Sequence, residues 1–362
     1  MSTLATTSAL LAGPLAHAID YPATAEGPQV DDYFGTQVAD PYRWLEDDNS
    51  DATKAWVAAQ NKVTFAYLDR IPFRVAVQQR IRALADYPKY GVPFRKNGFV
   101  YFYKNDGLQN QAVLYVQKGL DGTPEVLLDP NTFSADSTIR LESFALSRDG
   151  RYAAYETTAI PGSDWHDLHV LDMATRKPLP DMLRWIRFSS TAWRGDGFYY
   201  SRYPEPARGS ELTAPTEHQK VYFHRVGTAQ SDDVLVFEDP AHPRRFNSVE
   251  TTEDERFAIR ASQEPGRLGN DLWVRDETAS ETTFRPLVAE ISDDRFDVID
   301  NDGAELLLRT NRDAPNGRLM RADLAKPAFA DWATVLPERS EPLSQVSSAG
   351  GRLFAVYLKD VT

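Results

Sequence analysis

Short runs of apolar, β-forming residues recur along most of the chain, and each is preceded by a tight-turn signal. The runs that follow the turns begin near Phe99, Tyr152, Phe198, Phe257, Leu306 and Leu353. Successive starts are about 45 to 60 residues apart, which is the length of one four-stranded blade of a β-propeller. The pattern therefore predicts a series of antiparallel sheets arranged around a common axis.

The turn signals support this interpretation. Two-residue hairpin loops need positive φ, which Gly and Asn tolerate, and most copies supply such residues: Asn97-Gly98, Asp149-Gly150, Asp196-Gly197, Asp302-Gly303 and Gly350-Gly351. Copy four has Asp254-Glu255 instead. Further short runs, such as residues 113–116 and 125–129, raise the expected number of strands to about four in each copy. The last copy has one run after its turn, residues 353–357, and five residues follow it.

The segment before the repeats has a helical pattern. Ala52, Trp56, Ala59, Val63 and Tyr67 recur at three- and four-residue steps, after the N-cap candidates Asn49-Ser50-Asp51. A second apolar stripe follows the break at Ile71-Pro72 and comprises Phe73, Val77, Ile81, Leu84 and Ala85. The two stripes predict a helical pair between about residues 40 and 86. Both stripes need a surface to cover, either the propeller or a part of the protein that this chain lacks.

The pattern thus predicts a mainly β fold, an incomplete β-propeller of about five blades plus the start of a sixth. We assign residues 1–20 to a leader, 21–88 to a helical arm and 89–362 to the truncated propeller. In the leader, Ala16-His17-Ala18 resembles a signal-peptidase site, but no Lys or Arg precedes Arg43. The location is therefore cytoplasmic or, if that site is cleaved, periplasmic or secreted. No segment approaches the length that spans a membrane, so no membrane partner is expected.

The composition of the chain excludes several kinds of partner and catalytic site. The net charge of −13 disfavours nucleic acid as a partner, because an acidic chain repels phosphates. The chain has no cysteine, which excludes disulfides, thiolate catalysis and Cys-based zinc sites. It also has no G-x-S-x-G turn of the kind that exposes a serine nucleophile.

Other candidate sites have structural interpretations. Ser163, Asp164 and His166 have the residue types of a catalytic triad, but neighbours on an extended chain face opposite sides. For the same reason His166 and His169 cannot both bind one metal ion. The pairs Asp232-Asp233 and Asp293-Asp294 suggest a propeller glycosidase, but sequence neighbours do not give carboxylates facing each other across a cleft. We therefore predict no catalytic residue, metal site or cofactor in this chain.

Several motifs, in order along the chain, resemble the prolyl oligopeptidase family of serine peptidases. They begin with Asp40-Pro41-Tyr42-Arg43-Trp44-Leu45-Glu46-Asp47 and continue with Ala59-Gln60-Asn61, Tyr87-Pro88-Lys89-Tyr90, Gly107-Leu108-Gln109-Asn110-Gln111, Gly162-Ser163-Asp164-Trp165, His218-Gln219-Lys220 and Thr310-Asn311-Arg312. Each motif is short, so the resemblance depends on their order and spacing from about residue 20 onward.

This resemblance implies a two-part enzyme. A seven-bladed propeller caps an α/β-hydrolase domain that carries the Ser-Asp-His triad, and this C-terminal domain is absent from the chain. The complete enzyme would hydrolyse short, proline-containing oligopeptides after proline, with the propeller as a size filter and gate. The chain alone would be inactive, with the C-terminal hydrolase segment as its partner.

The resemblance also implies two substrate-binding residues. Phe188 matches an aromatic that lines a subsite near the catalytic centre, and Val236 matches a small apolar position of the same pocket. Both residues also have a simpler interpretation as propeller core. An alternative hypothesis for the whole chain is a non-catalytic β-propeller that serves as a binding module.

Overall fold

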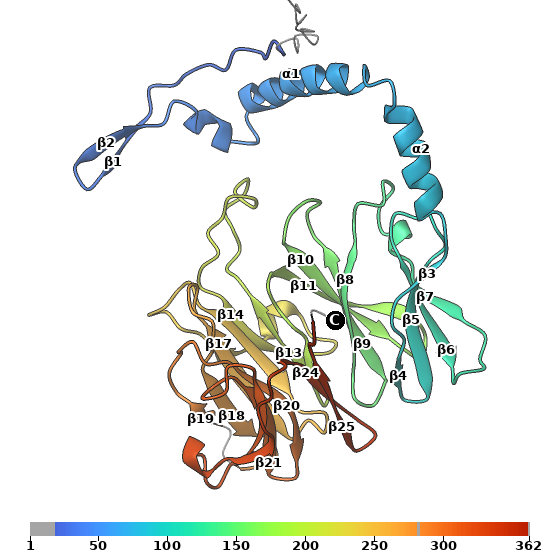
Figure 1. Cartoon of the computed structure of the whole chain (residues 1–362), viewed down its shortest axis with the longest axis vertical. Coiled ribbons are helices and arrows are strands. Elements are labelled where there is room, and N and C mark those ends of the chain that lie inside the picture. The colour runs from blue at the N-terminus through green and yellow to red at the C-terminus, as the bar shows by residue number, and fades with distance from the viewer. Residues whose placement is uncertain (1–18, 281–282, 361–362) are drawn as a thin grey trace, which may run out of the picture. The chain divides into compact units, whose positions relative to one another are not determined.

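The structure is a computed structural model that describes residues 19–280 and 283–360 (Figure 1). The chain divides into two compact units, with the boundary between Tyr87 and Pro88. The candidate signal sequence, residues 9–18, lies outside the described residues. Each unit is described by itself.

The N-terminal unit contains the two predicted helices, α1 (Asp51–Leu68) and α2 (Arg74–Ala85). Helix α1 begins after Ser50, whose Oγ accepts a hydrogen bond from the amide of Thr53 at 3.1 Å, as an N-cap should. Pro72 lies between the two helices, where the missing amide hydrogen disfavours a continuous helix. The sequence did not predict the hairpin that precedes the helices, β1 (Val30–Tyr33) and β2 (Thr36–Ala39).

Two tryptophans fix the extended segment at the start of this unit. The indole of Trp44, in the 3₁₀ helix η1 (Arg43–Glu46), donates to the carbonyl of Ala25 at 2.9 Å. The indole of Trp56, in α1, donates to Thr24 Oγ1 at 2.9 Å. The Arg43 guanidinium is bound by the carboxylates of Asp31 and Asp40. The motif around Trp44 therefore joins the extended segment, the hairpin and η1 into one unit.

The second unit is built from antiparallel meanders, which we call blades 1 to 5 in chain order (Figure 1). Blade 1 contains β3 (Lys89–Tyr90), β4 (Phe94–Lys96), β5 (Phe99–Asn105), β6 (Val113–Lys118) and β7 (Glu125–Leu128). Blade 2 contains β8 (Leu141–Leu146), β9 (Tyr152–Thr158), β10 (His166–Asp172) and β11 (Lys177–Ile186). Blade 3 contains β12 (Ala192–Arg194), β13 (Gly197–Arg202), β14 (Lys220–Arg225) and β15 (Val234–Phe237).

The remaining sheets continue the series. Blade 4 contains β16 (Phe246–Thr251), β17 (Phe257–Gln263), β18 (Leu272–Asp276) and β19 (Arg285–Val288). Blade 5 contains β20 (Phe296–Asp302), β21 (Glu305–Thr310), β22 (Arg318–Asp323) and β23 (Ala333–Leu336). The sixth sheet has two strands within the described residues, β24 (Leu343–Ala349) and β25 (Arg352–Tyr357). The prediction of a mainly β, incomplete propeller preceded by a helical arm is confirmed.

The core of this unit lies between the sheets. Each buried apolar cluster draws on two neighbouring blades: Leu114 of blade 1 clusters with Leu171 of blade 2, and Leu168 of blade 2 with Phe198 of blade 3, which also pairs with blade 2 through Ile186 and Arg202. Phe257 of blade 4 likewise clusters with Leu306 of blade 5. Because a single sheet cannot bury both of its faces, each blade is stabilised mainly by the blade beside it.

Candidate functional site

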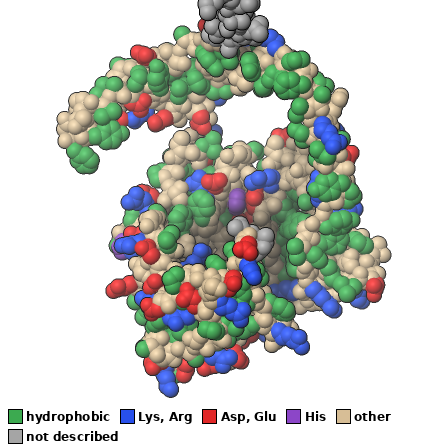
Figure 2. Space-filling model, viewed as in Figure 1, with side chains coloured by type: hydrophobic (Ala, Val, Ile, Leu, Met, Phe, Trp, Pro, Cys, Tyr) green, Lys and Arg blue, Asp and Glu red, His purple; other side chains and the backbone are tan. Residues whose placement is uncertain are grey.

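The first strands of the blades surround a cavity in the propeller unit, and Figure 2 shows this unit hollowed between its sheets. The cavity has a volume of about 450 Å³. Four blades contribute to its wall, through Phe94, Leu146, Trp193 and Glu250 among others. Apolar side chains such as Phe94 and Trp193 share its wall with a larger number of polar and charged side chains.

Phe188 lies in the loop between blades 2 and 3 and projects an aromatic ring to the surface. Its side chain is 53% exposed, and its φ of +49° is unusual for a residue with a side chain. The ring meets Phe246, the first residue of β16, edge to face with centroids 5.5 Å apart. The two rings therefore form an exposed aromatic pair that joins the start of blade 3 to the start of blade 4.

A buried amide holds the backbone of Phe188 in this conformation. Gln219 is 2% exposed, and its side-chain NH₂ donates to the carbonyls of Arg187 (3.1 Å) and Phe188 (3.0 Å). Its side-chain oxygen accepts from the backbone amide of Asn247 at 2.7 Å. Asn247 follows Phe246, so a single glutamine fixes the backbone beneath both rings. The sequence analysis did not identify Gln219 or Phe246 as site residues.

A cation lies beside the aromatic pair. The Arg187 guanidinium is 5.6 Å from the ring centre of Phe188 and 4.6 Å from that of the buried Trp165. It also donates to Thr216 Oγ1 at 3.2 Å. Trp165 packs edge to face on Tyr203, and burial raises the pKa of Tyr203 to about 12 despite the opposing effect of Arg187. The guanidinium also lies 3.6 Å from the Asp164 carboxylate and the Arg187 side chain is only 12% exposed, so this part of the site offers an aromatic surface beside a paired cation.

The structure places the second predicted substrate residue in a different environment. Val236 lies in β15, is partly buried, and packs against Val249 and Ala258 in the core between blades 3 and 4. The contacts that surround Phe188 involve Phe246, Arg187 and Gln219. The described contacts therefore do not bring Val236 and Phe188 together, and substrate binding by each of them stays a prediction.

The serine and histidines that resemble catalytic groups have local partners. Ser163 Oγ donates to the carbonyl of Ile160 at 2.7 Å and accepts from the amide of Trp165 at 3.2 Å, so it closes a turn. His166 pairs with the buried Glu156 at 2.8 Å, and these interactions with Glu156 raise the pKa of the imidazole. His169 contacts Thr157 instead, at 3.1 Å.

The paired carboxylates are also held by neighbours. Asp233 accepts hydrogen bonds from Tyr200 and His224, and Asp294 pairs with Arg312 at 2.9 Å. Across residues 19–280 and 283–360, no group of three or more His, Asp or Glu residues is placed to hold a metal ion. Neither α1 nor α2, the helices in the described part of the chain, is both long and apolar enough to cross a bilayer.

Comparison with known proteins gives consistent matches over most of the chain. A protein-family model described as "Prolyl oligopeptidase, N-terminal beta-propeller domain" matches residues 22–362. A prolyl endopeptidase of Elizabethkingia meningoseptica is 42% identical over 94% of this chain and 48% of its own length. Prolyl oligopeptidase A of Amanita bisporigera is 32% identical over 94% of this chain and 49% of its own length.

The fold of a solved structure also matches. Prolyl oligopeptidase B of Galerina marginata, bound to a 35-residue hydrolysis and macrocyclization substrate, superimposes with a TM-score of 0.82 at 28% identity. The superposition covers 94% of this chain and 51% of that protein. The chain spans about half the length of the curated relatives it matches.

Proposed function

Because the chain belongs to the prolyl oligopeptidase family, we propose that it is the propeller region of a serine endopeptidase that hydrolyses short peptides after proline. The observation that carries this proposal is the match of arm and blades together, residues 22–362, to one family. In this proposal the nucleophile and its partners belong to a C-terminal hydrolase segment. The arm, residues 21–88, packs on that segment, which would cover the exposed side chains of Phe65, Ile81 and Leu84.

The propeller contributes binding and selection in this proposal. A cavity of about 450 Å³ has room for a peptide of a few residues but not for a folded protein, and this supports a role of the propeller as a size filter. Phe188 and Phe246 offer a flat apolar surface on which a proline ring or another apolar side chain can pack. The adjacent Arg187 packs against the Phe188 ring and pairs with Asp164, and so supports this surface from one side.

Complementation tests the proposal directly. The chain is mixed with a separately produced C-terminal half of the Elizabethkingia meningoseptica prolyl endopeptidase, and hydrolysis of a chromogenic peptide with proline before the scissile bond is measured. We expect no turnover from either half alone and turnover from the mixture. The control is the same C-terminal half with its nucleophilic serine replaced by alanine. This mixture should not hydrolyse the peptide.

Two results would contradict the proposal. Sustained turnover by the chain alone would show that it carries its own nucleophile. If light scattering detects a complex of the two halves but the mixture hydrolyses no proline peptide, the result would favour a propeller that serves only as a binding module.

A further inference from the structure

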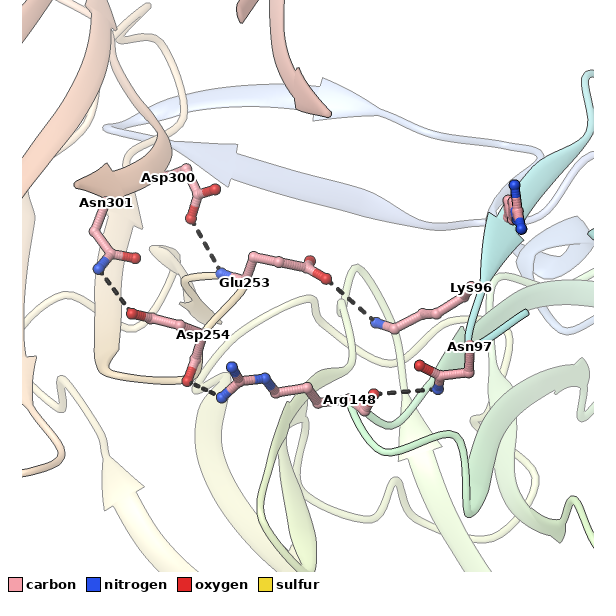
Figure 3. Close-up of a pocket in the computed structure, with 8 residues that line it drawn as sticks. Lys96, Asn97, Arg148, Glu253, Asp254, Asp300 and Asn301 are labelled. Carbon is pink, nitrogen blue, oxygen red and sulfur yellow. Dashed lines mark hydrogen bonds and ion pairs between the residues drawn. The ribbon is translucent and has the colours of Figure 1, made fainter. Parts of the chain in front are cut away.

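Residues at or beside one inner turn in each of blades 1, 2, 4 and 5 line a cavity of about 530 Å³ at one end of the channel (Figure 3). Figure 3 shows side chains from blades 1, 2, 4 and 5 pointing toward one another there. We call residues 253–255, in the β16–β17 turn of blade 4, the axial turn. All three residues are acidic, and this turn makes contacts with blades 1, 2, 3 and 5.

The axial turn contacts each of the first three blades. Glu253 Oε1 lies 4.0 Å from Lys96 Nζ of blade 1. The carbonyl of Asp254 accepts a hydrogen bond from the guanidinium of Arg148 in blade 2. Glu255 Oε2 accepts from the backbone amide of Gly195 in blade 3 at 2.8 Å.

The same turn also contacts blade 5. The amide of Glu253 donates to Asp300 Oδ1 at 3.2 Å, and Asn301 donates to Asp254 Oδ2 at 3.0 Å. Burial alone would raise the pKa of Asp254, but hydrogen bonds from Asn301 and from its own turn hold that pKa below its ordinary value. The Asp254 carboxylate is therefore ionised near neutral pH.

These contacts differ in kind from those between neighbouring blades. The buried apolar clusters of the described residues each join adjacent sheets, and none of them joins blade 4 to blade 1 or blade 2. Lys96 and Arg148, by contrast, reach the axial turn across the width of the channel. Polar contacts at this one end thus couple blades 1 and 2 directly to blade 4, whereas blade 3 also meets blade 4 through a buried apolar core.

The backbone of the axial turn adds an independent observation. The equivalent turn of blade 2 has the same closing hydrogen bond, from the Gly150 amide to the Ser147 carbonyl (3.0 Å), as Glu255 makes to Thr252 (2.8 Å). Gly150 adopts φ +70°, and Glu255 adopts φ +60° at the same position. Positive φ is unfavourable for glutamate and free of strain for glycine. Strain of this kind persists where a side chain is needed, and the Glu255 carboxylate is the group that contacts blade 3.

We propose that the axial turn is an electrostatic clasp that holds blades 1 and 2 against blade 4, anchors the inner turn of blade 3, and so sets the width of this end of the channel. The clasp is independent of any peptidase activity. It depends on Glu253 for blade 1, on Arg148 for blade 2 and on Glu255 for blade 3. Loss of these contacts leaves the apolar cores between neighbouring blades intact and lets blades 1 and 2 move away from blade 4.

Distance measurements between spin labels test the clasp on the chain itself. The chain has no cysteine, so Leu120→Cys in blade 1 and Leu268→Cys in blade 4 give two labelling sites, and both leucines are exposed. Glu253→Gln with Glu255→Gly removes two contacts, and the glycine is the residue that blade 2 uses at this position. We expect longer and broader label distances for this variant. We also expect lengthening of the parent distances when salt rises from about 0.1 M to about 1 M, because the screening length falls from about 10 Å to about 3 Å.

Asp196→Asn is the matched control. It also removes a carboxylate from an inner turn, but the ion pair of Asp196 is with Arg225 of its own blade. Circular dichroism verifies that every variant keeps its sheets. Label distances that coincide in the parent and the double variant at both salt concentrations would overturn the proposal. An equal shift in the Asp196→Asn control would also overturn it, because general charge loss would then explain the change.

Discussion

His224 is the most completely buried titratable residue of blade 3. No part of its side chain is exposed, and its two ring nitrogens face the carboxylates of Asp233 (2.7 Å) and Asp181 (3.0 Å). Both nitrogens can donate only when the imidazole is charged. Burial lowers the pKa of His224, but hydrogen bonds and attraction from the two carboxylates outweigh it, so the pKa is raised. The network links β11 of blade 2 to β14 of blade 3 through one buried imidazole.

The raised pKa predicts how stability depends on pH. A group whose pKa is higher in the folded state stabilises fully below its unfolded pKa of about 6.5, and this contribution is lost as the pH rises through the folded value. We expect His224→Gln to cost about 3 to 5 kcal/mol at pH 6, since it leaves buried carboxylates without their cation. Urea unfolding of both proteins at pH 6 and at pH 9 measures the loss. An equal loss at the two pH values would show that the imidazole is not charged in the folded state.

Gln219 is a second buried residue that we expect to stabilise the fold through its hydrogen-bond partners. Replacing it by leucine leaves the carbonyls of Arg187 and Phe188 and the amide of Asn247 without that partner. We expect Gln219→Leu to lower the free energy of unfolding by about 2 kcal/mol or more, because each unsatisfied buried group costs about 1 to 3 kcal/mol.

A matched control exists in blade 1. Gln117 bonds the carbonyls of Gly119 and Leu120 in its own hairpin and is only partly buried, so Gln117→Leu should cost clearly less. Urea unfolding compares the two variants. Equal decreases in the free energy of unfolding would mean that the hydrogen bonds beneath Phe188 do not stabilise the fold more than those of Gln117.

At the scale of elements, turn chemistry and apolar runs predicted most of the strands. The predicted runs at residues 113–116 and 353–357 fall within β6 and β25. The full length of strand β11, Lys177–Ile186, is not evident from apolar runs, because Asp181 and Arg184 interrupt its apolar residues. The β1–β2 hairpin was missed because its residues lack apolar alternation, although Phe34 and Gly35 both adopt positive φ in the turn.

The start of α1 gives a prediction at this scale. Ser50 Oγ satisfies the Thr53 amide, one of the helix's unpaired N-terminal donors. Ser50→Ala should therefore weaken the first turn of α1 by about 1 kcal/mol, whereas Ser50→Thr should retain the bond. Hydrogen exchange of the amides at the start of α1 measures this. Unchanged protection in Ser50→Ala would show that the cap does not stabilise the helix.

At the scale of the whole molecule, the sixth sheet exposes apolar side chains on β25. Leu353, Phe354 and Val356 are all exposed, and β25 pairs only with β24 within the described residues. An exposed apolar edge strand is prone to pair with another chain. We therefore expect the isolated chain to self-associate, and Phe354→Lys with Val356→Lys to reduce that association.

Light scattering coupled to size-exclusion chromatography measures the effect. Leu268→Lys is the control, since it places a lysine at an exposed leucine far from this strand in the sequence. A monomeric parent chain, or an equal gain from the control, would contradict a role for β25.

The candidate site was only partly predictable from the sequence. The resemblance pointed to Phe188, but its contacts with Gln219 and Phe246 join residues from different blades, and local patterns contain no signal for such pairs. The contacts of the axial turn could not be predicted either, because they also join residues from different blades. Glu255 occupies the glycine position of a turn, which the sequence showed as an irregular copy, and only the fold reveals its partner in blade 3.

The meander order of the blades has a consequence for synthesis on the ribosome. Each sheet is made from one continuous segment, so its strands can pair soon after they emerge, and local contacts of this kind favour early folding. The bond from Arg148 to Asp254 joins residues 106 positions apart, so it must wait until blade 4 has been made. A nascent chain therefore acquires its sheets one by one and fixes their mutual spacing only late in translation.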